Sequence, residues 1–200
     1  MVDLLNIRFV ITRAQDFPRM AAFPWYRHIA SLPGNELFEN RTAFPRFFLV
    51  HQVRVVGSQE EAKDLIRRHQ INLRETATVE KPIDLPLDRG DARAFDRATT
   101  LRYEPTAIEI STQASVTSLL VLSETYYPGW KAWLDDQPTP ILPTDIALRG
   151  VVVPAGAHRV RMEFRPSILP IAFGISAATA IVLAFCAFLY RRSVSRIQLN

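Results

Sequence analysis

The stretch ILPIAFGISAATAIVLAFCAFLY, residues 168–190, contains no charged side chain and decides the architecture of this chain. With a rise of about 1.5 Å per residue, a helix of this length reaches roughly 35 Å, while the hydrocarbon core of a bilayer is about 30 Å thick. A buried helix of a large soluble protein has a similar composition, but a chain of 200 residues offers too little core to surround it on every side. The stretch therefore predicts a transmembrane helix, residues 167–190, close to the C-terminus.

Arginines flank this helix at both ends. Arg165 precedes it, and Arg191 and Arg192 follow it in a basic tail, residues 191–200. Basic residues are enriched on the cytoplasmic side of a membrane, so the tail favours a cytoplasmic C-terminus and an extracytoplasmic main domain, although the arginine at the other end weakens this signal. We expect all three arginines to anchor the helix at the bilayer surfaces.

One face of the helix carries small residues at every fourth position: Ala172, Ser176, Ala180 and Ala184. Small side chains let helix backbones approach closely in a membrane, although such residues are also common in membrane helices in general. The pattern favours neighbouring transmembrane helices as partners, in addition to the lipid bilayer.

Charge and cysteine content narrow the function classes. The formal net charge of +4 owes three charges to arginines of the tail, so no basic block remains to follow a nucleic-acid backbone. The single cysteine, Cys186, lies within the predicted membrane helix, which excludes an intramolecular disulfide and a cysteine-based metal site. We expect no nucleic acid among the partners.

The N-terminal stretch MVDLLNIRFVITR, residues 1–13, shows no export signal, because Asp3 and Arg8 interrupt its only apolar run. Taken literally, this start predicts a cytoplasmic adaptor domain with a C-terminal membrane anchor. If the chain is the end of a longer protein, preceding membrane helices deliver the start of the domain to the outside. Both interpretations follow from the sequence.

Residues 1–79 predict a small α/β extracytoplasmic unit. We expect strands, the first of them mostly buried, at residues 4–12, 36–39, 46–56 and 71–79. A short helical turn is expected at residues 25–30. A longer helix begins after Ser58, because Ser58 and Glu61 form the S-x-x-E capping box. Two prolines, a glycine and alternating charges then mark a linker at residues 80–92.

The region of residues 93–166 has an all-β pattern. Short strands separated by Pro, Gly, Asp and Gln are expected at residues 100–103, 107–112, 115–125, 130–134, 146–153 and 158–164. Strands of this length and spacing are typical of a β-sandwich. The chain therefore falls in the α+β class, with a small α/β unit, a β-sandwich and one C-terminal transmembrane helix.

Five side chains on or near one of these strands form a candidate glycan-binding surface: Tyr126, Tyr127, Lys131, Trp133 and Asp135. Because neighbouring strand residues point to opposite faces, we expect Trp130 in the core and Trp133 on a polar face, between a cation and a carboxylate. An indole ring with hydrogen-bonding neighbours is suited to hold a sugar ring. In two alternatives, Trp133 packs under the proline-rich segment 138–143 or lies at the membrane interface.

Patterns typical of catalysis, metal binding or cofactor binding are missing from the sequence. Asp135 and Asp136 are adjacent, so on a strand they point to opposite faces, and a turn explains them better than an acid/base pair does. The four histidines are far apart in sequence and match no metal-ligand spacing. A glycine-rich phosphate loop and a G-x-S-x-G motif are both absent. We predict no catalytic residue, metal ion or cofactor in this chain.

Several ordered motifs resemble one bacterial family. SETYYPGWKAWLDD at residues 123–136 and ALRGVVVPAGAHRVRMEFRP at residues 147–166, followed by an apolar span, resemble the C-terminal end of the YfhO family of polytopic membrane proteins. LLNIRF at residues 4–9 and LFEN at residues 37–40 resemble that family's motifs at the start of its large extracytoplasmic region. The resemblance implies a glycosyltransferase-like protein that takes sugars from polyprenyl-phosphate carriers and modifies cell-envelope polymers.

Two departures from the family pattern bear on this implication. The usual Asp-Gly turn is replaced by Asp135 and Asp136, which predicts a longer or looser loop, because aspartate tolerates positive φ less well than glycine. Family members are also several times longer and carry their acidic catalytic residue in an early loop that has no counterpart here. The resemblance thus implies a C-terminal part without catalytic residues. The alternative is a non-enzymatic, membrane-anchored module that binds or assembles envelope glycan.

Overall fold

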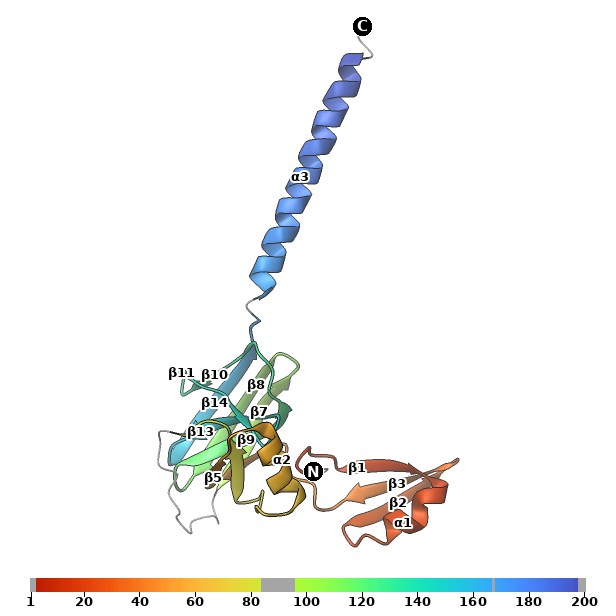
Figure 1. The fold of residues 1–200 in the computed structure, drawn as a ribbon, viewed down its shortest axis with the longest axis vertical. Coiled ribbons are helices and arrows are strands. Elements are labelled where there is room, and N and C mark those ends of the chain that lie inside the picture. Colours follow the sequence, from red (N-terminus) through yellow and green to blue (C-terminus); the bar gives the residue numbers. More distant parts are fainter. Residues whose placement is uncertain (1–2, 84–95, 167, 198–200) are drawn as a thin grey trace. The chain divides into compact units, whose positions relative to one another are not determined.

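The computed structural model describes residues 3–83, 96–166 and 168–197 (Figure 1). The chain divides into two compact units, Met1–Phe164 and Arg165–Asn200, and each is described by itself. Among the described residues, strands dominate the first unit and an apolar helix forms the second. This composition confirms the predicted α+β class.

Five antiparallel strands form one sheet of the first unit, in the order β11-β10-β14-β8-β7. The strands are β7 (Arg97–Glu104), β8 (Ala107–Ala114), β10 (Trp130–Leu134), β11 (Gln137–Thr139) and β14 (Gly156–Phe164). All except β11 lie where the sequence predicts strands. The short strand β11 contains Pro138, and it accommodates this residue because it lies at the edge of the sheet, where a missing N–H costs no ladder hydrogen bond.

A second sheet has six strands in the order β4-β9-β13-β12-β6-β5. They are β4 (Phe47–Val50), β5 (Gln52–Val55), β6 (Thr76–Val79), β9 (Ser118–Thr125), β12 (Leu142–Thr144) and β13 (Leu148–Val153). Only β5 and β6 pair in parallel among these described strands, and α2 (Gln59–Arg67) connects them. Ser58 caps α2 as predicted, since its Oγ accepts a hydrogen bond from the Glu61 N–H at 3.2 Å.

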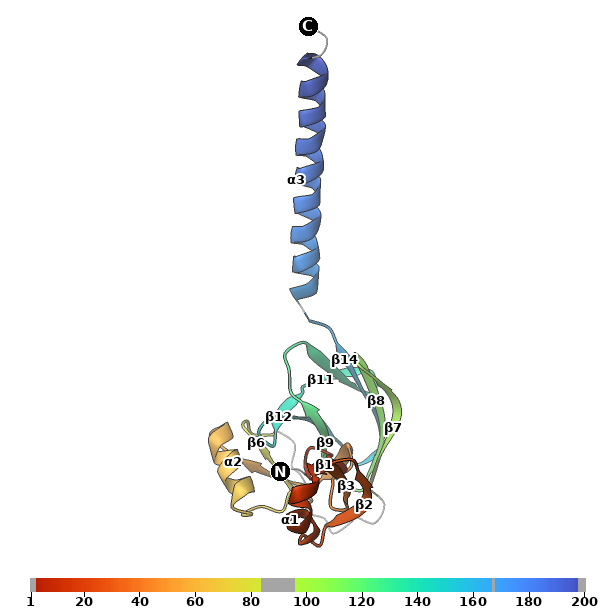
Figure 2. The same cartoon turned by 90° about the vertical axis from the view of Figure 1, so that its right-hand side faces the viewer.

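The two sheets lie face to face and enclose the main core (Figure 2). The five-stranded sheet contributes Ile110, Val160 and Met162, while the six-stranded sheet contributes Leu120 and Val151, all of them fully buried. These residues occupy alternate positions along their strands, which is the periodicity that the sequence shows. The packing gives the predicted β-sandwich.

The far side of the six-stranded sheet carries a second core. Leu119 and Val121 of β9 pack there with Val50, Leu4 and Phe44. β9 is therefore buried on both faces, which explains its uninterrupted apolar run LLVL.

A three-stranded antiparallel sheet precedes the sandwich, in the order β1-β3-β2 (Figure 1). It consists of β1 (Phe9–Arg13), β2 (Tyr26–Leu32) and β3 (Asn35–Asn40), with the short helix α1 (Phe17–Ala21) between β1 and β2. The ring of Phe17 lies 5.7 Å from the ring of Phe38 on β3, so α1 covers one face of this sheet.

Three predictions for the N-terminal region are wrong. The strand predicted at residues 4–12 begins only at Phe9, and its side chains alternate between exposed and half-buried, because the described chain leaves one side of the sheet open. The helical turn predicted at residues 25–30 is instead part of β2, whose pairing with β3 overrides the local preference. The strand predicted at residues 46–56 is two strands, which lie at opposite edges of the six-stranded sheet.

The second unit contains α3 (Ile168–Ile197). Its segment Ile168–Ala187 has a mean hydropathy of 2.3 and is long and apolar enough to cross a bilayer. This finding supports the predicted transmembrane helix.

The predicted domain boundaries stay predictions. Most of the predicted linker, residues 84–92 of 80–92, lies outside the described residues, as does the end of the predicted tail, residues 198–200. Strands from both sides of the linker, β6 and β12, pair within the six-stranded sheet.

Candidate functional site

Strand β10 carries the candidate site. Ala132 is buried, and Trp130 and Leu134 pack against the core between the sheets. Lys131 and Trp133 occupy the intervening positions and therefore lie on the opposite face, where Lys131 is exposed. The outer face of the sheet thus presents an ammonium group beside an indole ring.

A cavity of about 540 Å³ opens beside β10. Its lining consists of Tyr126, Trp130, Lys131, Ala132, Trp133, Pro138, Thr139, Pro140 and Ile141. β11 pairs with β10 only from Ala132 onward, so the first two residues of β10 have no partner strand on this edge within the described chain. The cavity forms where the short edge strand leaves β10 uncovered.

The indole ring of Trp133 lies between β14 and β11. Arg161 on β14 is its cross-strand neighbour, and the guanidinium carbon of Arg161 lies 4.4 Å from the ring centroid. On the other side, Trp133 pairs with Pro138 of β11, which also lines the cavity. A hydrogen bond of 2.5 Å from Arg161 Nη1 to Glu163 Oε1 holds the guanidinium in place. The plane of the indole ring is therefore fixed by its neighbours before a ligand arrives.

Lys131 is the cation of this cavity. It forms no ion pair with any described residue, and the lining contains no acidic side chain. Tyr126, 38% exposed, places a phenol at the same opening. The cavity therefore combines aromatic walls with a small number of hydrogen-bonding groups.

The other two predicted residues, Tyr127 and Asp135, do not line the cavity. Tyr127 is directed toward Phe164, with a distance of 6.2 Å between ring centroids. Asp135 Oδ2 lies 2.6 Å from His158 Nδ1, and its Oδ1 accepts the Arg159 N–H at 2.8 Å. The hydrogen bond with His158 lowers the pKa of Asp135 and raises the pKa of His158.

Asp135 and Asp136 form a two-residue turn between β10 and β11. Their φ angles of 48° and 65° lie in the left-handed region, as in a type I′ hairpin turn. The prediction of a longer or looser loop is therefore wrong. The two hydrogen bonds that the Asp135 carboxylate makes with β14 offset the unfavourable backbone conformation.

A buried arginine supports the Trp130 wall of the cavity. Arg149 is 2% exposed, and its guanidinium carbon lies 4.1 Å from the centroid of the Trp130 ring. Its Nη2 lies 3.3 Å from Oε2 of Glu124. The other oxygen of this carboxylate, Oε1, lies 2.7 Å from Arg46 Nη1 and accepts a hydrogen bond from the Tyr103 hydroxyl at 2.6 Å. Burial lowers the pKa of Arg149. The sequence analysis missed this residue, although one arginine in the apolar strand LRGVVV was an available signal.

The structure also contains a Ser–His–Asp arrangement that the sequence did not suggest. His51 Nδ1 lies 2.9 Å from Ser118 Oγ, and His51 Nε2 lies 2.7 Å from Asp96 Oδ2. Ser118 is fully buried and donates its proton to the Val116 carbonyl at 2.8 Å. A catalytic serine must face its substrate and give its proton to the base. The three side chains therefore have a structural role: they connect the start of β9 to the residue between β4 and β5.

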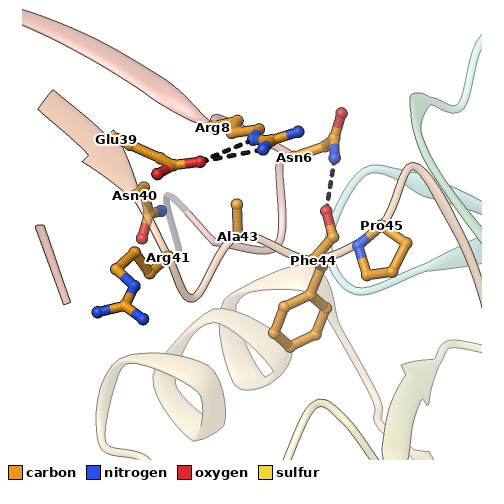
Figure 3. A pocket seen from close by; sticks show the side chains of 8 residues that line it. All are labelled: Asn6, Arg8, Glu39, Asn40, Arg41, Ala43, Phe44 and Pro45. Carbon is orange, nitrogen blue, oxygen red and sulfur yellow. Dashed lines mark hydrogen bonds and ion pairs between the residues drawn. The ribbon is translucent and has the colours of Figure 1, made fainter. Parts of the chain in front are cut away.

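A second cavity, of about 410 Å³, lies where the N-terminal segment meets the segment after β3 (Figure 3). Its lining consists of Asn6, Arg8, Glu39, Asn40, Arg41, Ala43, Phe44 and Pro45. Arg8 Nη2 lies 3.0 Å from Glu39 Oε1, and Asn6 Nδ2 donates to the Phe44 carbonyl at 2.5 Å. This cavity has a lining of charged, polar and apolar groups, and it takes residues from both N-terminal motifs, LLNIRF and LFEN.

The remaining predicted functional residues lie around α3. Arg165 precedes this helix, and Arg191 and Arg192 lie in its C-terminal part. Their role at the bilayer surface stays a prediction. Within the described ranges, no group of three or more His, Cys, Asp or Glu side chains is placed to hold a metal ion.

Comparisons with known proteins found one family that part of the chain resembles. A search of curated proteins gave no match, and a search of solved structures also gave none. The sequence pattern of one family, bacterial membrane protein YfhO, matches residues 91–176. That segment contains the whole five-stranded sheet with the cavity beside β10, and it reaches into α3. The matching family and the apolar helix both indicate that the protein resides in a membrane. Residues 91–176 are therefore similar to the bacterial membrane protein YfhO family, the same family that the sequence motifs resemble.

Proposed function

We propose that this chain is the extracytoplasmic part and final membrane helix of a YfhO-type protein that transfers sugars from polyprenyl-phosphate carriers to cell-envelope polymers. In this proposal, the cavity beside β10 holds a sugar ring of the glycan. The supporting observation is that three of the five residues that the sequence predicts on one glycan-binding surface, Tyr126, Lys131 and Trp133, line one cavity.

The lining matches the chemistry of a sugar. A pyranose ring has an apolar C–H face that packs on an indole, and a rim of hydroxyls that need hydrogen bonds. Trp133 supplies the plate, while the Lys131 ammonium and the Tyr126 hydroxyl supply polar partners at the opening. The volume of about 540 Å³ falls within the range of roughly 300–1,000 Å³ that is common for small-ligand sites.

The bond-forming step belongs to another part of the protein in this proposal. Asp135 and Asp136 form a turn, and both oxygens of Asp135 are engaged by β14, so these carboxylates do not flank a substrate bond. The residues described here bind and orient a glycan, while membrane helices outside residues 1–200 supply the catalytic groups.

A non-enzymatic envelope module is the second candidate. The same cavity would serve a protein that only binds or assembles glycan. The observation that favours it is that the described carboxylates near the cavity are held in a turn. Cells that lack the protein distinguish the two functions: a loss of sugar substitution on the envelope polymer supports transfer, whereas a normal substitution pattern with altered polymer retention supports the module.

Glycan binding is tested with the full chain in lipid nanodiscs, by saturation-transfer NMR against cellobiose, maltose and chitobiose and by co-sedimentation with insoluble envelope polymer. We expect Trp133→Ala to weaken binding at least about tenfold, which corresponds to roughly 1.4 kcal/mol. Trp25→Ala is the matched control, because Trp25 is 41% exposed and lies in the turn before β2, outside the lining of the cavity. Absence of binding by the wild-type chain, or equal binding by both variants, would contradict the proposed site.

A further inference from the structure

The N-terminal sheet has one covered face and one open face. On the covered face, Phe17 of α1 packs near Phe38, which is fully buried, and near His28, whose ring centroid lies 5.1 Å away. This packing gives the sheet a small core of its own. The other face has no comparable cover among the described residues.

The open face carries large apolar side chains: Phe9, Ile11, Leu32 and Leu37. They lie on the same face because Ile11 is paired with Leu37, while Phe9 and Leu32 are paired with β3 residues two positions away from Leu37. Phe9 is 55% exposed, Ile11 64% and Leu32 46%. Contiguous apolar surface of this kind on a folded unit marks an interaction site.

Arginines surround this open face. Arg8 and Arg27 both bind the carboxylate of Glu39, at 3.0 and 2.6 Å, and their side chains are 66% and 63% exposed. Arg13 lies on the same face as Ile11 and forms no ion pair with a described residue. Two guanidinium groups therefore share one carboxylate and a third has no described ion-pair partner, which leaves the rim of the open face positively charged.

The second cavity, shown in Figure 3, adjoins this rim. Arg8 connects the open face to the cavity. Its guanidinium carbon lies 5.5 Å from the ring centroid of Phe9, and the residue also lines the cavity. Arg41, on the cavity wall, is exposed and forms no ion pair with a described residue. The cavity thus offers a positively charged space next to an apolar plate.

We propose that the open face of the N-terminal sheet docks on the anionic phospholipid surface of the bilayer. Phe9, Ile11 and Leu32 enter the boundary between head groups and acyl chains, while the rim arginines contact lipid phosphates. Two observations favour lipid over a protein partner. The helix α3 is long and apolar enough to cross a bilayer, and apolar side chains flanked by more arginines than carboxylates are complementary to an anionic lipid surface.

The test uses the full chain, one copy per nanodisc, with Cys186→Ala so that one introduced cysteine takes an environment-sensitive nitrobenzoxadiazole label. Ile11→Cys places the label on the open face. Glu60→Cys is the matched control, because the Glu60 side chain on α2 is 80% exposed. In discs of about 30% phosphatidylglycerol, we expect the Ile11 label to shift to the blue and to be quenched by iodide about fivefold less than the Glu60 label.

Lipid charge separates the outcomes. We expect the protection at Ile11 to fall at least about threefold in pure phosphatidylcholine discs, and to fall similarly in anionic discs when Arg13→Glu is introduced. Equal quenching of the two labels in anionic discs overturns the proposal. Protection that is independent of both lipid charge and Arg13 also overturns it, because a cover other than the anionic surface would then be responsible. Melting curves of the labelled variants confirm that each is folded, since both positions are exposed.

Discussion

The guanidinium carbon of Arg149 lies 4.1 Å from the ring centroid of Trp130, so a buried cation backs one wall of the cavity beside β10. Arg149 Nε and Nη1 have no hydrogen-bond partner within the described part of the chain. Among the described residues, the Arg149 guanidinium stacks on the Trp130 ring and lies 3.3 Å from the Glu124 carboxylate. The planar shape of the guanidinium, more than its charge, therefore fits this position.

Variants of Arg149 test this interpretation. Arg149→Met is expected to change the free energy of unfolding by less than about 1 kcal/mol, because a flexible apolar chain fills the space and Glu124 keeps its contacts with Arg46 and Tyr103. Arg149→Lys is expected to lower it by about 2–3 kcal/mol, because a compact ammonium loses the stacking and remains buried. Thermal unfolding of the full chain in detergent micelles, followed by circular dichroism, measures both. A lysine variant as stable as the wild type would contradict this account.

The sandwich could be predicted from the sequence because its strands carry their own signal. Val160 and Met162 alternate with charged residues along β14, and this alternation alone places them in the core. The same parity placed Trp130 inside and Trp133 outside before any contact was known. The same reasoning failed for the N-terminal sheet, because the apolar residues Phe9 and Ile11 of β1 predict a buried face and lie instead on the face that the described chain leaves open.

The contacts of the candidate site could not be predicted, because they depend on the register between distant strands. The register between β10 and β14 places Arg161 over the Trp133 ring. The same register places the Asp135 carboxylate beside His158 instead of beside the cavity. Likewise, the arrangement of His51 with Ser118 joins residues 67 positions apart. Local patterns in a sequence carry no information about such pairings.

The buried carboxyl of Asp145 is expected to limit stability near neutral pH. Asp145 is 3% exposed; its Oδ1 accepts hydrogen bonds from the Thr78 N–H and hydroxyl, while its Oδ2 has no partner within the described ranges. Burial raises its pKa from 3.8 to about 6. Because the folded pKa exceeds the unfolded value, the folded state binds the proton more tightly, and stability is lost as the pH rises from about 4 through 6.

Asp145→Asn removes this charge and keeps an acceptor for Thr78. We expect the free energy of unfolding to rise by about 1–2 kcal/mol at about pH 7.5 and to change by less than about 0.5 kcal/mol at about pH 4. Unfolding of the two proteins over this pH range measures the difference. An equal gain at both pH values would show that the carboxylate charge is not responsible.

The pair of Asp135 and His158 gives the hairpin turn a pH window of its own. The hydrogen bond with Asp135 raises the pKa of His158 above 6.5. The contribution of His158 to the free energy of unfolding is therefore complete below pH 6.5 and is lost as the pH rises through the pKa of the folded state. The pKa of Asp135 is lowered from 3.8, so its contribution is present above that value and is lost as the pH falls. The pair should stabilise the turn most between about pH 4 and 6.5.

This window is measured best in the Asp145→Asn background, which removes the other carboxyl expected to titrate near pH 6. With His158→Gln added, we expect a lower melting temperature at about pH 5.5 and a smaller difference from the parent at about pH 8.5. A constant difference across this range would mean that His158 acts only through its neutral hydrogen bonds.

Gly150 is expected to tolerate no side chain, because β13 passes close to β12 at this point. A Cβ on Gly150 would lie 2.3 Å from Thr144 Oγ1 and 3.2 Å from Leu119 Cδ1. Thr144 is buried and its hydroxyl donates to the Leu142 carbonyl at 3.0 Å, so it is poorly placed to move aside. Gly150→Ala should therefore lower the free energy of unfolding by about 2–4 kcal/mol.

Two comparisons separate this clash from a general effect of replacing glycine. Gly174→Ala on α3 adds the same methyl group where nothing lies within 4 Å, so the melting temperature of the strand-rich unit should stay unchanged. Adding Thr144→Ala to Gly150→Ala removes the hydroxyl that the new Cβ would meet, and about half of the lost stability should return. If Gly150→Ala lowers the free energy of unfolding no more than Gly174→Ala does, β12 and β13 do not approach each other as closely as described. The explanation of why glycine follows Arg149 would then also be wrong.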